Sequence, residues 1–543
     1  MGTIPQRIKH FRRDLNQWSL YAVALSLFIA IPIFAIVINL FGGTGEMWSH
    51  IVTYFLLDYI GNSVLLIIGT GILCVLMGVS SAWIVTKYEF PFRQPLEWAL
   101  FLPLAIPSYI VAYAYVGMLG NGGSLMRLLQ TWGIGIQKIE MMNLAGLVWV
   151  LSVSLFPYVY ASTKAMFGSQ PHALRDSAYL LGASERKYFY RIALPLALPA
   201  IIGGLFLVFM EVLNDYGAAK YYGINTFTTG IFRTWTALED LESAIYLSAL
   251  LVVLVFILMG LVRLQRGRKS YSFKVKEQQG QKARRVSLEG RKKILYPILV
   301  FLPVLFGFVL PLGQLLYWAV LTFEAMFNLE LLWITLQSFG VAFSAAFLVI
   351  ICAVASVYFA KWSNLRGFAL FTKVATIGYV IPGAIIGIGI ISSSQFIINF
   401  FDNSFGLKIG FLFYGSSVVL VYAYIFRFLA VAYNPIEANS LKLGKSLSEA
   451  AYLLRKKRLS TLFSIELPLL KATLISAFLL VFIDTLKELP LTLILKPYDL
   501  NTLAVSAYAY ADDERVPEAA LPALMLIGTV VLVLFFVNYK RKR

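Results

Sequence analysis

The sequence predicts an all-α polytopic membrane protein of about 12 transmembrane helices, arranged as two parallel six-helix repeats. The first reason is composition, since 59% of the 543 residues are hydrophobic and only 14% are charged, whereas soluble domains carry about 25% charged residues. The second reason is the length of the uncharged runs, many of which reach the roughly 20 apolar residues that a helix needs to cross a bilayer. The third is a charged segment that occurs twice in the chain.

Six membrane spans are predicted in each half of the chain. In the first half they lie near residues 18–40, 61–84, 98–119, 144–163, 194–213 and 243–262. In the second half they lie near residues 294–318, 336–360, 374–394, 411–432, 469–486 and 519–538. The span at 469–486 has the weakest pattern because it contains Lys471, whose long side chain we expect to reach the membrane interface.

The formal net charge of +18 has the distribution of a membrane protein. Basic residues gather at both chain ends, in the segment between the halves and in the two charged loops, and few lie in the loops predicted to be outside. Because cytoplasmic loops carry the excess of Lys and Arg, both termini are predicted to be cytoplasmic, which requires an even number of spans. This distribution argues against a nucleic-acid partner.

The duplicated charged segment sets the register of the two repeats. Every position of the first copy recurs in the second at one constant offset, which we call the motif offset. The matched positions are Asp176, Ser177, Ala178, Gly182, Ile192, Leu194 and Pro195 in the first copy and Glu449, Ala450, Ala451, Arg455, Ile465, Leu467 and Pro468 in the second. Residues 106–108 match 381–383, and 62–63 match 337–338, at nearly the same offset. Both copies lie between spans in the same order, so the repeats are parallel and related by an axis along the membrane normal.

The repeats divide the chain into six segments. They are an amino-terminal cytoplasmic segment with the first transmembrane helix and outer loop (1–60), the first core repeat (61–263), a basic cytoplasmic linker (264–293), the seventh helix with its outer loop (294–333), the second core repeat (334–538) and a basic cytoplasmic tail (539–543). The linker is too polar for a packed core. It is interpreted either as a contact for anionic lipid or a regulator, or as a solvated tether.

Local chemistry predicts a short helix and a bend in each copy of the motif. Residues 176–181 and 449–454 are expected to be helical, with the leading carboxylate at the helix amino terminus, where the helix dipole favours negative charge. Gly182 suits a turn that disfavours a Cβ atom. The second copy has Arg455 at this position, so the sequence leaves open whether the second loop bends in the same way.

Small residues and prolines complete the motif. Ala178 and Ala451 permit close approach of neighbouring groups because their side chains are small. Pro195 and Pro468 are expected in the first turn of the next membrane helix, where a missing N–H is tolerated.

This repeated loop resembles the EAA loop of permease subunits in binding-protein-dependent ABC importers. The resemblance implies the type I ABC importer permease fold, a location in the bacterial cytoplasmic (inner) membrane, and a coupling role for the motif residues. It implies as partners two copies of an ABC ATPase subunit and a periplasmic or lipid-anchored binding protein, besides membrane lipid. ATP and Mg would bind the partner ATPase, so we expect no cofactor, no catalytic residue and no enzymatic activity in this chain.

Segments after each motif narrow the resemblance to the ferric-iron permeases. These segments are 214–217 and 226–235 in the first half and 487–495 and 513–515 in the second. The resemblance implies ferric iron as the substrate and a ferric-iron-binding protein as the external partner. Fused permeases for thiamine or a phosphonate are alternatives. A twelve-helix secondary transporter also has two six-helix halves, but it does not need twin ATPase-docking loops.

Two pairs of carboxylates form the candidate substrate path. Glu211 and Asp215, like Asp484 and Glu488, are spaced i, i+4 toward the outer end of the span after the motif, so each pair is predicted to share one helix face. Carboxylates beside a membrane span are costly and usually functional. Oxygen ligands suit a hard cation such as ferric iron, although no stably bound metal is expected.

An alternative interpretation gives these carboxylates no role in transport. They would then lie in interfacial water, or pair with Lys220 and Lys487.

Overall fold

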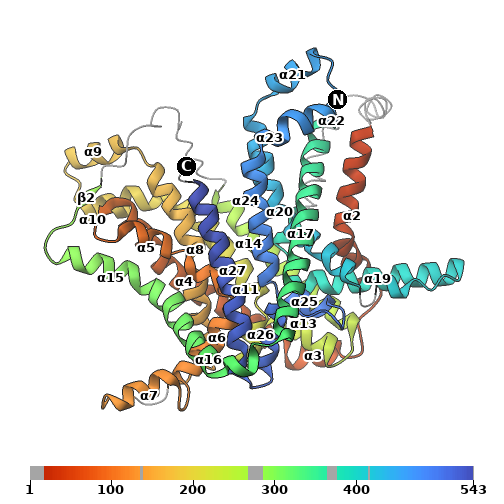
Figure 1. The fold of residues 1–543 in the computed structure, drawn as a ribbon, viewed down its shortest axis with the longest axis horizontal. Coiled ribbons are helices and arrows are strands. Elements are labelled where there is room, and N and C mark those ends of the chain that lie inside the picture. Colours follow the sequence, from red (N-terminus) through yellow and green to blue (C-terminus); the bar gives the residue numbers. More distant parts are fainter. Residues whose placement is uncertain (1–16, 135–138, 267–284, 364–375, 414–415, 542–543) are drawn as a thin grey trace.

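The computed structural model describes residues 17–134, 139–266, 285–363, 376–413 and 416–541, most of which are helical. Long helices form a bundle, and short helical loops that contain α9 (His172–Leu180) and α21 (Lys445–Leu453) project from the same end of it (Figure 1). We call this the loop end and the opposite one the far end. The first described helix starts at the loop end, and the last helix finishes there (Figure 1).

Short helices separate the long ones in the first half of the chain. The elements in order are α2 (Gln17–Asn39), α3 (Trp48–Tyr54), α4 (Leu56–Lys87), β1 (Tyr88–Glu89), α5 (Arg93–Ala99), η1 (Leu102–Ala105), α6 (Ser108–Leu119), α7 (Ser124–Thr131), α8 (Leu144–Ser169), α9, α10 (Glu185–Tyr188), η2 (Phe189–Ala193), α11 (Leu194–Asn214), α12 (Gly217–Tyr221), α13 (Phe227–Thr236) and α14 (Leu241–Arg266).

The second half repeats most of this order. Its elements are β2 (Val286–Ser287), α15 (Lys292–Val304), η4 (Leu305–Val309), α16 (Leu310–Met326), α17 (Leu329–Trp362), η5 (Thr376–Tyr379), α19 (Gly383–Phe405), η6 (Gly410–Leu412), α20 (Ser417–Lys442), α21, α22 (Arg458–Thr461), η7 (Leu462–Glu466), α23 (Leu467–Leu469), α24 (Lys471–Lys487), α25 (Pro490–Leu495), α26 (Leu503–Asp512), η8 (Val516–Ala519) and α27 (Ala520–Arg541).

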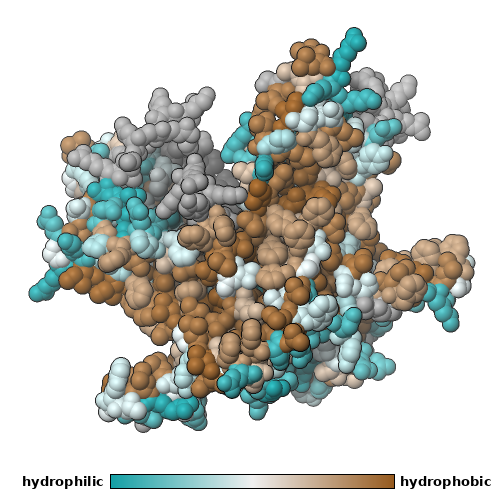
Figure 2. All heavy atoms as spheres, in the orientation of Figure 1, coloured by the Kyte–Doolittle hydropathy of each residue, from teal (hydrophilic) through white to brown (hydrophobic). Residues whose placement is uncertain are grey.

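Length and hydropathy confirm the predicted class of polytopic helical membrane protein. Among the described residues, ten helices could cross a membrane, or up to twelve if each of two bent helix pairs counts as one span. Apolar side chains cover the middle of the molecule, and hydrophilic ones gather toward its two ends (Figure 2). The two loops project from one end, which is the parallel relation that the repeated motif predicts.

Two predicted spans are not single straight helices. The first, predicted at 98–119, bends by 94° between Arg93–Ala105 and Ser108–Thr131. The second, predicted at 469–486, bends by 76° between Arg458–Leu469 and Lys471–Lys487. The first bend lies at Pro107, which has extended backbone angles and precedes α6. The helix breaks here because proline has no N–H to continue the helical hydrogen bonds.

The same break recurs in the second half at Pro382. Its φ of −54° and ψ of 142° nearly equal those of Pro107, −55° and 144°. The helix predicted at 374–394 therefore begins at Gly383 and continues to Phe405, while residues 374–375 lie outside the described ranges.

Three Leu-Pro pairs each follow a short π-helical segment. Leu194, Leu310 and Leu467 donate their backbone N–H to the carbonyl five residues earlier, and the next residue is proline each time. A proline removes one regular helical hydrogen bond, and π-helical hydrogen bonding, although rare, occurs mostly as such single turns within α-helices. Pro195 thus lies in the first turn of α11, as predicted, but after a π-turn. Pro468 lies in the short α23, which a 76° bend separates from α24, so it is not in the first turn of that membrane helix.

The first membrane helix of each half packs on the opposite half. Helix α2 contacts α17 and α19, while α15 and α16 contact α4 and α6. The Ser19 and Ser363 hydroxyls lie 2.8 Å apart, and Tyr115 donates to the carbonyl of Phe306 at 2.8 Å. This exchange makes the two repeats one interlocked body.

The end of the basic linker pairs with the first repeat. Strand β2 forms a parallel two-residue ladder with β1, in which Tyr88 lies opposite Val286. The Nη1 atom of Arg285 lies 3.4 Å from Oε2 of Glu89. Residues 267–284, most of the predicted linker, lie outside the described ranges, as do 1–16 and 542–543 at the predicted basic termini.

Candidate functional site

The helix of the first motif loop begins earlier than predicted. Helix α9 starts at His172, directly after Pro171, so Asp176 lies in its second turn. The prediction that the carboxylate leads the helix is therefore wrong, because no helix-breaking residue separates Asp176 from Pro171. Asp176 instead lies 3.5 Å from Nε of Arg175. Helix α21 likewise begins at Lys445, four residues before Glu449.

The bend after each helix is the same in both loops. Gly182 has a φ of 76°, and Arg455 has a φ of 57°. Both values lie in the left-handed region, which costs a residue with a Cβ about 1–2 kcal/mol. The next residue closes the turn in both copies, since the N–H of Ala183 and that of Lys456 donate to the carbonyls of Ala178 and Ala451.

The remaining motif residues have matching burial. Ala178 and Ala451 are buried within their own loops, so they permit close packing inside the loop. The exposed residues are Ser177 and Pro195 in the first copy and Ala450 and Pro468 in the second. The half-buried residues are Ile192 and Leu194 in the first copy and Ile465 and Leu467 in the second.

Sequence reasoning missed two pairs of leucines at the tips of these loops. Leu180 and Leu181 are 89% and 87% exposed, and Leu453 and Leu454 are 85% and 78% exposed. Each pair lies directly before the bend, and the two pairs are related by the motif offset. Adjacent exposed leucines on a charged loop are typical of a surface that binds another protein. Their repetition was a signal available in the sequence.

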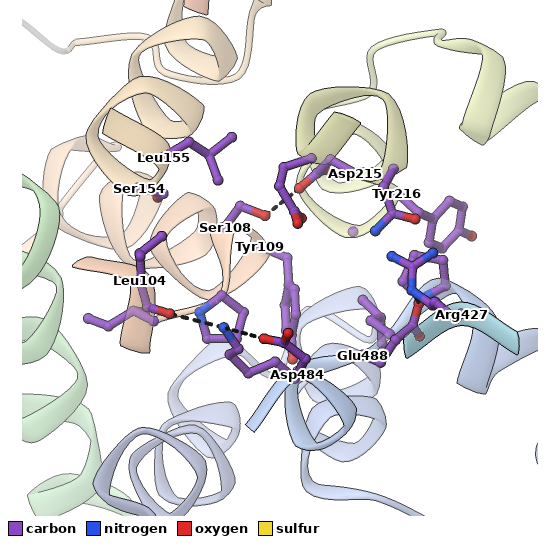
Figure 3. A pocket seen from close by; sticks show the side chains of 18 of the residues that line it. Leu104, Ser108, Tyr109, Ser154, Leu155, Asp215, Tyr216, Arg427, Asp484 and Glu488 are labelled. Carbon is purple, nitrogen blue, oxygen red and sulfur yellow. Dashed lines mark hydrogen bonds and ion pairs between the residues drawn. The ribbon is translucent and has the colours of Figure 1, made fainter. Parts of the chain in front are cut away.

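All four predicted path carboxylates line one cavity of about 120 Å³, and Asp215, Asp484 and Glu488 are labelled in Figure 3. Glu211 and Asp215 come from the end of α11, and Asp484 and Glu488 come from the end of α24. Helices α6, α8 and α20 supply much of the remaining wall. The cavity therefore lies between the two repeats, with two acidic residues from each.

The second carboxylate of each pair lies beyond its helix. Asp215 follows the end of α11 and accepts from the N–H groups of Ala218 and Ala219 at 3.0 and 3.1 Å. Glu488 follows the end of α24 and accepts from the N–H of Leu491 at 3.0 Å. The predicted shared helix face is therefore wrong, because each of these residues instead caps the next short helix, α12 or α25.

Two basic side chains balance part of this acidic charge. Nε of Arg427 lies 3.4 Å from Oε1 of Glu488, and Nζ of Lys487 lies 3.8 Å from Oδ1 of Asp484. Lys487 also donates to the carbonyl of Leu104 at 3.2 Å. The alternative pairing with Lys487 is thus observed for Asp484. Lys220, the other proposed partner, is exposed and does not line the cavity.

Arg427 and Ser108 are cavity residues that sequence reasoning missed. Arg427 is a buried arginine inside the apolar helix α20, and a charge within a membrane span is a functional signal in itself. The Ser108 hydroxyl donates to Oδ2 of Asp215 (Figure 3). Ser108 follows the Pro107 break, so the break brings the start of α6 to the acidic end of α11.

The cavity does not have the geometry of a fixed metal centre. Within the part of the chain that the structure describes, no three His, Cys, Asp or Glu side chains converge closely enough to hold a metal ion. Four carboxylates face one arginine and one lysine, so the lining is acidic when these groups are ionised. Such a cavity attracts cations electrostatically without enclosing them in a ligand shell.

Known proteins similar to this chain are membrane permeases. Residues 74–270 match the model of the family described as "Binding-protein-dependent transport system inner membrane component". The Fe(3+)-transport system permease protein FbpB 2 of Haemophilus influenzae is 22% identical over 87% of this chain and 87% of its own length. The ferric transport system permease protein FbpB of Actinobacillus pleuropneumoniae is 23% identical over 94% of this chain and 76% of its own length. The molybdenum transport system permease protein ModB of Mycobacterium tuberculosis is 28% identical over 45% of this chain and 92% of its own length.

A duplicated helical bundle with twin loops at one end and a cavity between its halves defines a multi-pass transport permease. Over residues 74–270 the chain is similar to the binding-protein-dependent inner-membrane permeases, and over most of its length it is similar to permeases named for ferric-iron transport.

Proposed function

We propose that this chain is the permease subunit of an ATP-driven importer for ferric iron. The choice of substrate rests on how much of this chain each relative matches. Two relatives that match both halves of the chain, over 87% and 94% of its length, are named as ferric-iron permeases. The molybdenum and sulfate relatives match only 34–45% of it.

The charge of the cavity supports a cationic substrate. Each repeat contributes two carboxylates, and carboxylate oxygens suit hard cations. Asp215 and Glu488 are engaged as helix caps, whereas Glu211 and Asp484 cap no helix and Asp484 has a long, 3.8 Å contact with Lys487. Glu211 and Asp484 are therefore the carboxylates more available to a passing ion. We propose that they attract iron transiently as it crosses between the halves.

The two motif loops are proposed to couple transport to ATP hydrolysis. Each would dock on one copy of an ABC ATPase subunit, where ATP and Mg would bind, and the paired leucines offer the apolar contact. Two loops on one chain match the two subunits of an ATPase dimer. The loop end would then be cytoplasmic, with both termini on that side, and an iron-binding protein would dock at the far end.

Reconstitution tests this function directly. The chain would be purified with its ATPase and binding protein, placed in liposomes and supplied with radioactive ferric iron outside. We expect uptake that needs ATP inside and the binding protein outside. Uptake driven by an ion gradient without ATP would instead indicate a secondary transporter. ATP-driven uptake of thiamine, a phosphonate, molybdate or sulfate but not iron would overturn the choice of substrate.

A further inference from the structure

A buried lysine fixes the first motif loop to a membrane helix outside that loop. Lys87 is the last residue of α4, and its side chain is only 5% exposed. Its Nζ lies 3.0 Å from Oε1 of Glu185 in α10 and donates to the hydroxyl of Tyr179 in α9 at 3.3 Å. The ammonium also lies 4.8 and 5.2 Å from the ring centroids of Trp83 and Tyr88. A buried ammonium is costly unless it is paired, so this arrangement favours one position of the loop on α4.

The second half has a lysine at nearly the corresponding place. Lys361 lies one position beyond the site that the motif offset assigns to Lys87, in the last turn of α17. Its Nζ lies 3.0 Å from Oε2 of Glu466 in η7. Here the carboxylate is the buried partner, since Glu466 is 3% exposed and Lys361 is 28% exposed.

In the second half, a further contact joins the short helix after the bend to the end of α17, and it is not an ion pair. At the motif offset, the position in the second half that corresponds to Glu185 is Arg458. Arg458 donates from Nη1 to the carbonyl of Trp362, the last residue of α17, at 3.3 Å. In both halves, therefore, the short helix after the bend is bound to the carboxyl end of the long helix.

Helices α4 and α17 both reach the far end of the molecule. There each one binds the part of its own half that follows the cavity carboxylates in the chain. In α4, Asn62 donates to the carbonyl of Asn225 at 2.9 Å. In α17, the Ser338 hydroxyl accepts from the N–H of Leu503 at 2.7 Å. These segments begin α13 and α26. Each long helix thus connects a motif loop to the opposite end of the bundle.

We propose that Lys87 and Lys361 are positioning residues that latch the motif loops to α4 and α17. Movement of an ATPase bound to a loop would then be transmitted to the far end through α4 or α17. This route would act in addition to α11 or α24, the helices that follow each loop in the chain. This inference rests on the proposed coupling function, since it assigns the route by which the same loops act.

Lys87→Met is the sharper variant. Glu185 is 46% exposed, so water can solvate its carboxylate after the ammonium is lost, and folding should survive. In the reconstituted complex we expect the amount of iron moved per ATP hydrolysed to fall at least about fivefold, the lower end of typical coupling between sites. Hydrogen exchange of residues 176–181 should become faster, while the ATPase stays bound.

Lys164→Met is the matched control. Lys164 pairs with Glu97 at 2.7 Å and lies over two aromatic rings, but it joins α8 to α5 and does not contact the motif loop. It should change neither the transport ratio nor loop exchange. Lys87→Arg should restore most of the ratio, because guanidinium can still pair with Glu185.

Two outcomes would overturn the latch. One is an unchanged transport ratio in Lys87→Met despite faster loop exchange, which would limit Lys87 to local stiffness. The other is an equal loss of the ratio in Lys164→Met. Failure of the wild-type chain to bind an ATPase would instead contradict the proposed function, and the exchange comparison would still decide whether Lys87 holds the loop.

Discussion

Arg455 adopts the left-handed backbone conformation of Gly182, its counterpart in the first repeat, with φ values of 57° and 76°. The two loops therefore keep one shape although one of them has a side chain at the bend. Shape at this place is maintained by the loop's own hydrogen bonds, from Ala183 to Ala178 and from Lys456 to Ala451.

Replacing Arg455 by glycine should stabilise the second loop. Relief of the left-handed strain is worth about 1 kcal/mol, so hydrogen exchange of residues 449–456 should slow about fivefold. Gly182→Ala should have the opposite effect on the first loop. Faster exchange in Arg455→Gly would mean that the arginine side chain contributes contacts that outweigh the strain.

The exposed leucine pairs should contribute to ATPase binding and little to folding. Burying a leucine at an interface is worth about 1.5–3 kcal/mol. Leu180→Ser combined with Leu453→Ser should therefore weaken association with the ATPase at least about tenfold, as measured by binding to the detergent-solubilised chain.

The thermal stability of this leucine variant should be unchanged. Leu264→Ser, at an exposed position near the end of α14, is the control that should leave ATPase affinity intact. Undiminished affinity in the double variant would remove the leucines from the docking surface.

The four cavity carboxylates should separate into two functional pairs. Glu211→Gln with Asp484→Asn should reduce iron transport while docking and ATPase stimulation persist, because these side chains cap no helix. Asp215→Asn with Glu488→Gln should lower the thermal stability of the complex, since loss of a cap costs about 1 kcal/mol.

Transport and stability of both variants would be measured in one preparation. Full transport in a third variant that combines all four substitutions would show that the acidic residues do not attract the substrate. Loss of binding-protein docking in the first pair would place Glu211 and Asp484 at an external rim.

One permease chain should suffice for each complex. A single chain presents two loops, whereas a homodimer would present four to an ATPase dimer. Mass measurement of the purified assembly should give one permease and two ATPase subunits. Two permease chains in the transporting complex would contradict this stoichiometry.

The sequence by itself determined the membrane class, the parallel duplication and the places of the motif loops. These follow from local information, because long apolar runs specify spans and a repeat at constant offset specifies equivalent structure. Pro107 and Pro382 were visible as a matched pair, but the 94° bend at the first of them was not predicted.

Only the tertiary structure decided which groups meet. The exchange of α2 and of α15–α16 between the halves brings residues such as Ser19 and Ser363 together although they are far apart in the chain. The caps formed by Asp215 and Glu488 depend on where α11 and α24 end. Two further contacts depend on helices that are distant in the chain: Glu488 pairs with buried Arg427, and Lys87 pairs with Glu185. Hydrophobic periodicity specifies which face of a helix is buried, but it does not specify which neighbour covers that face, and this is why the cavity required the structure.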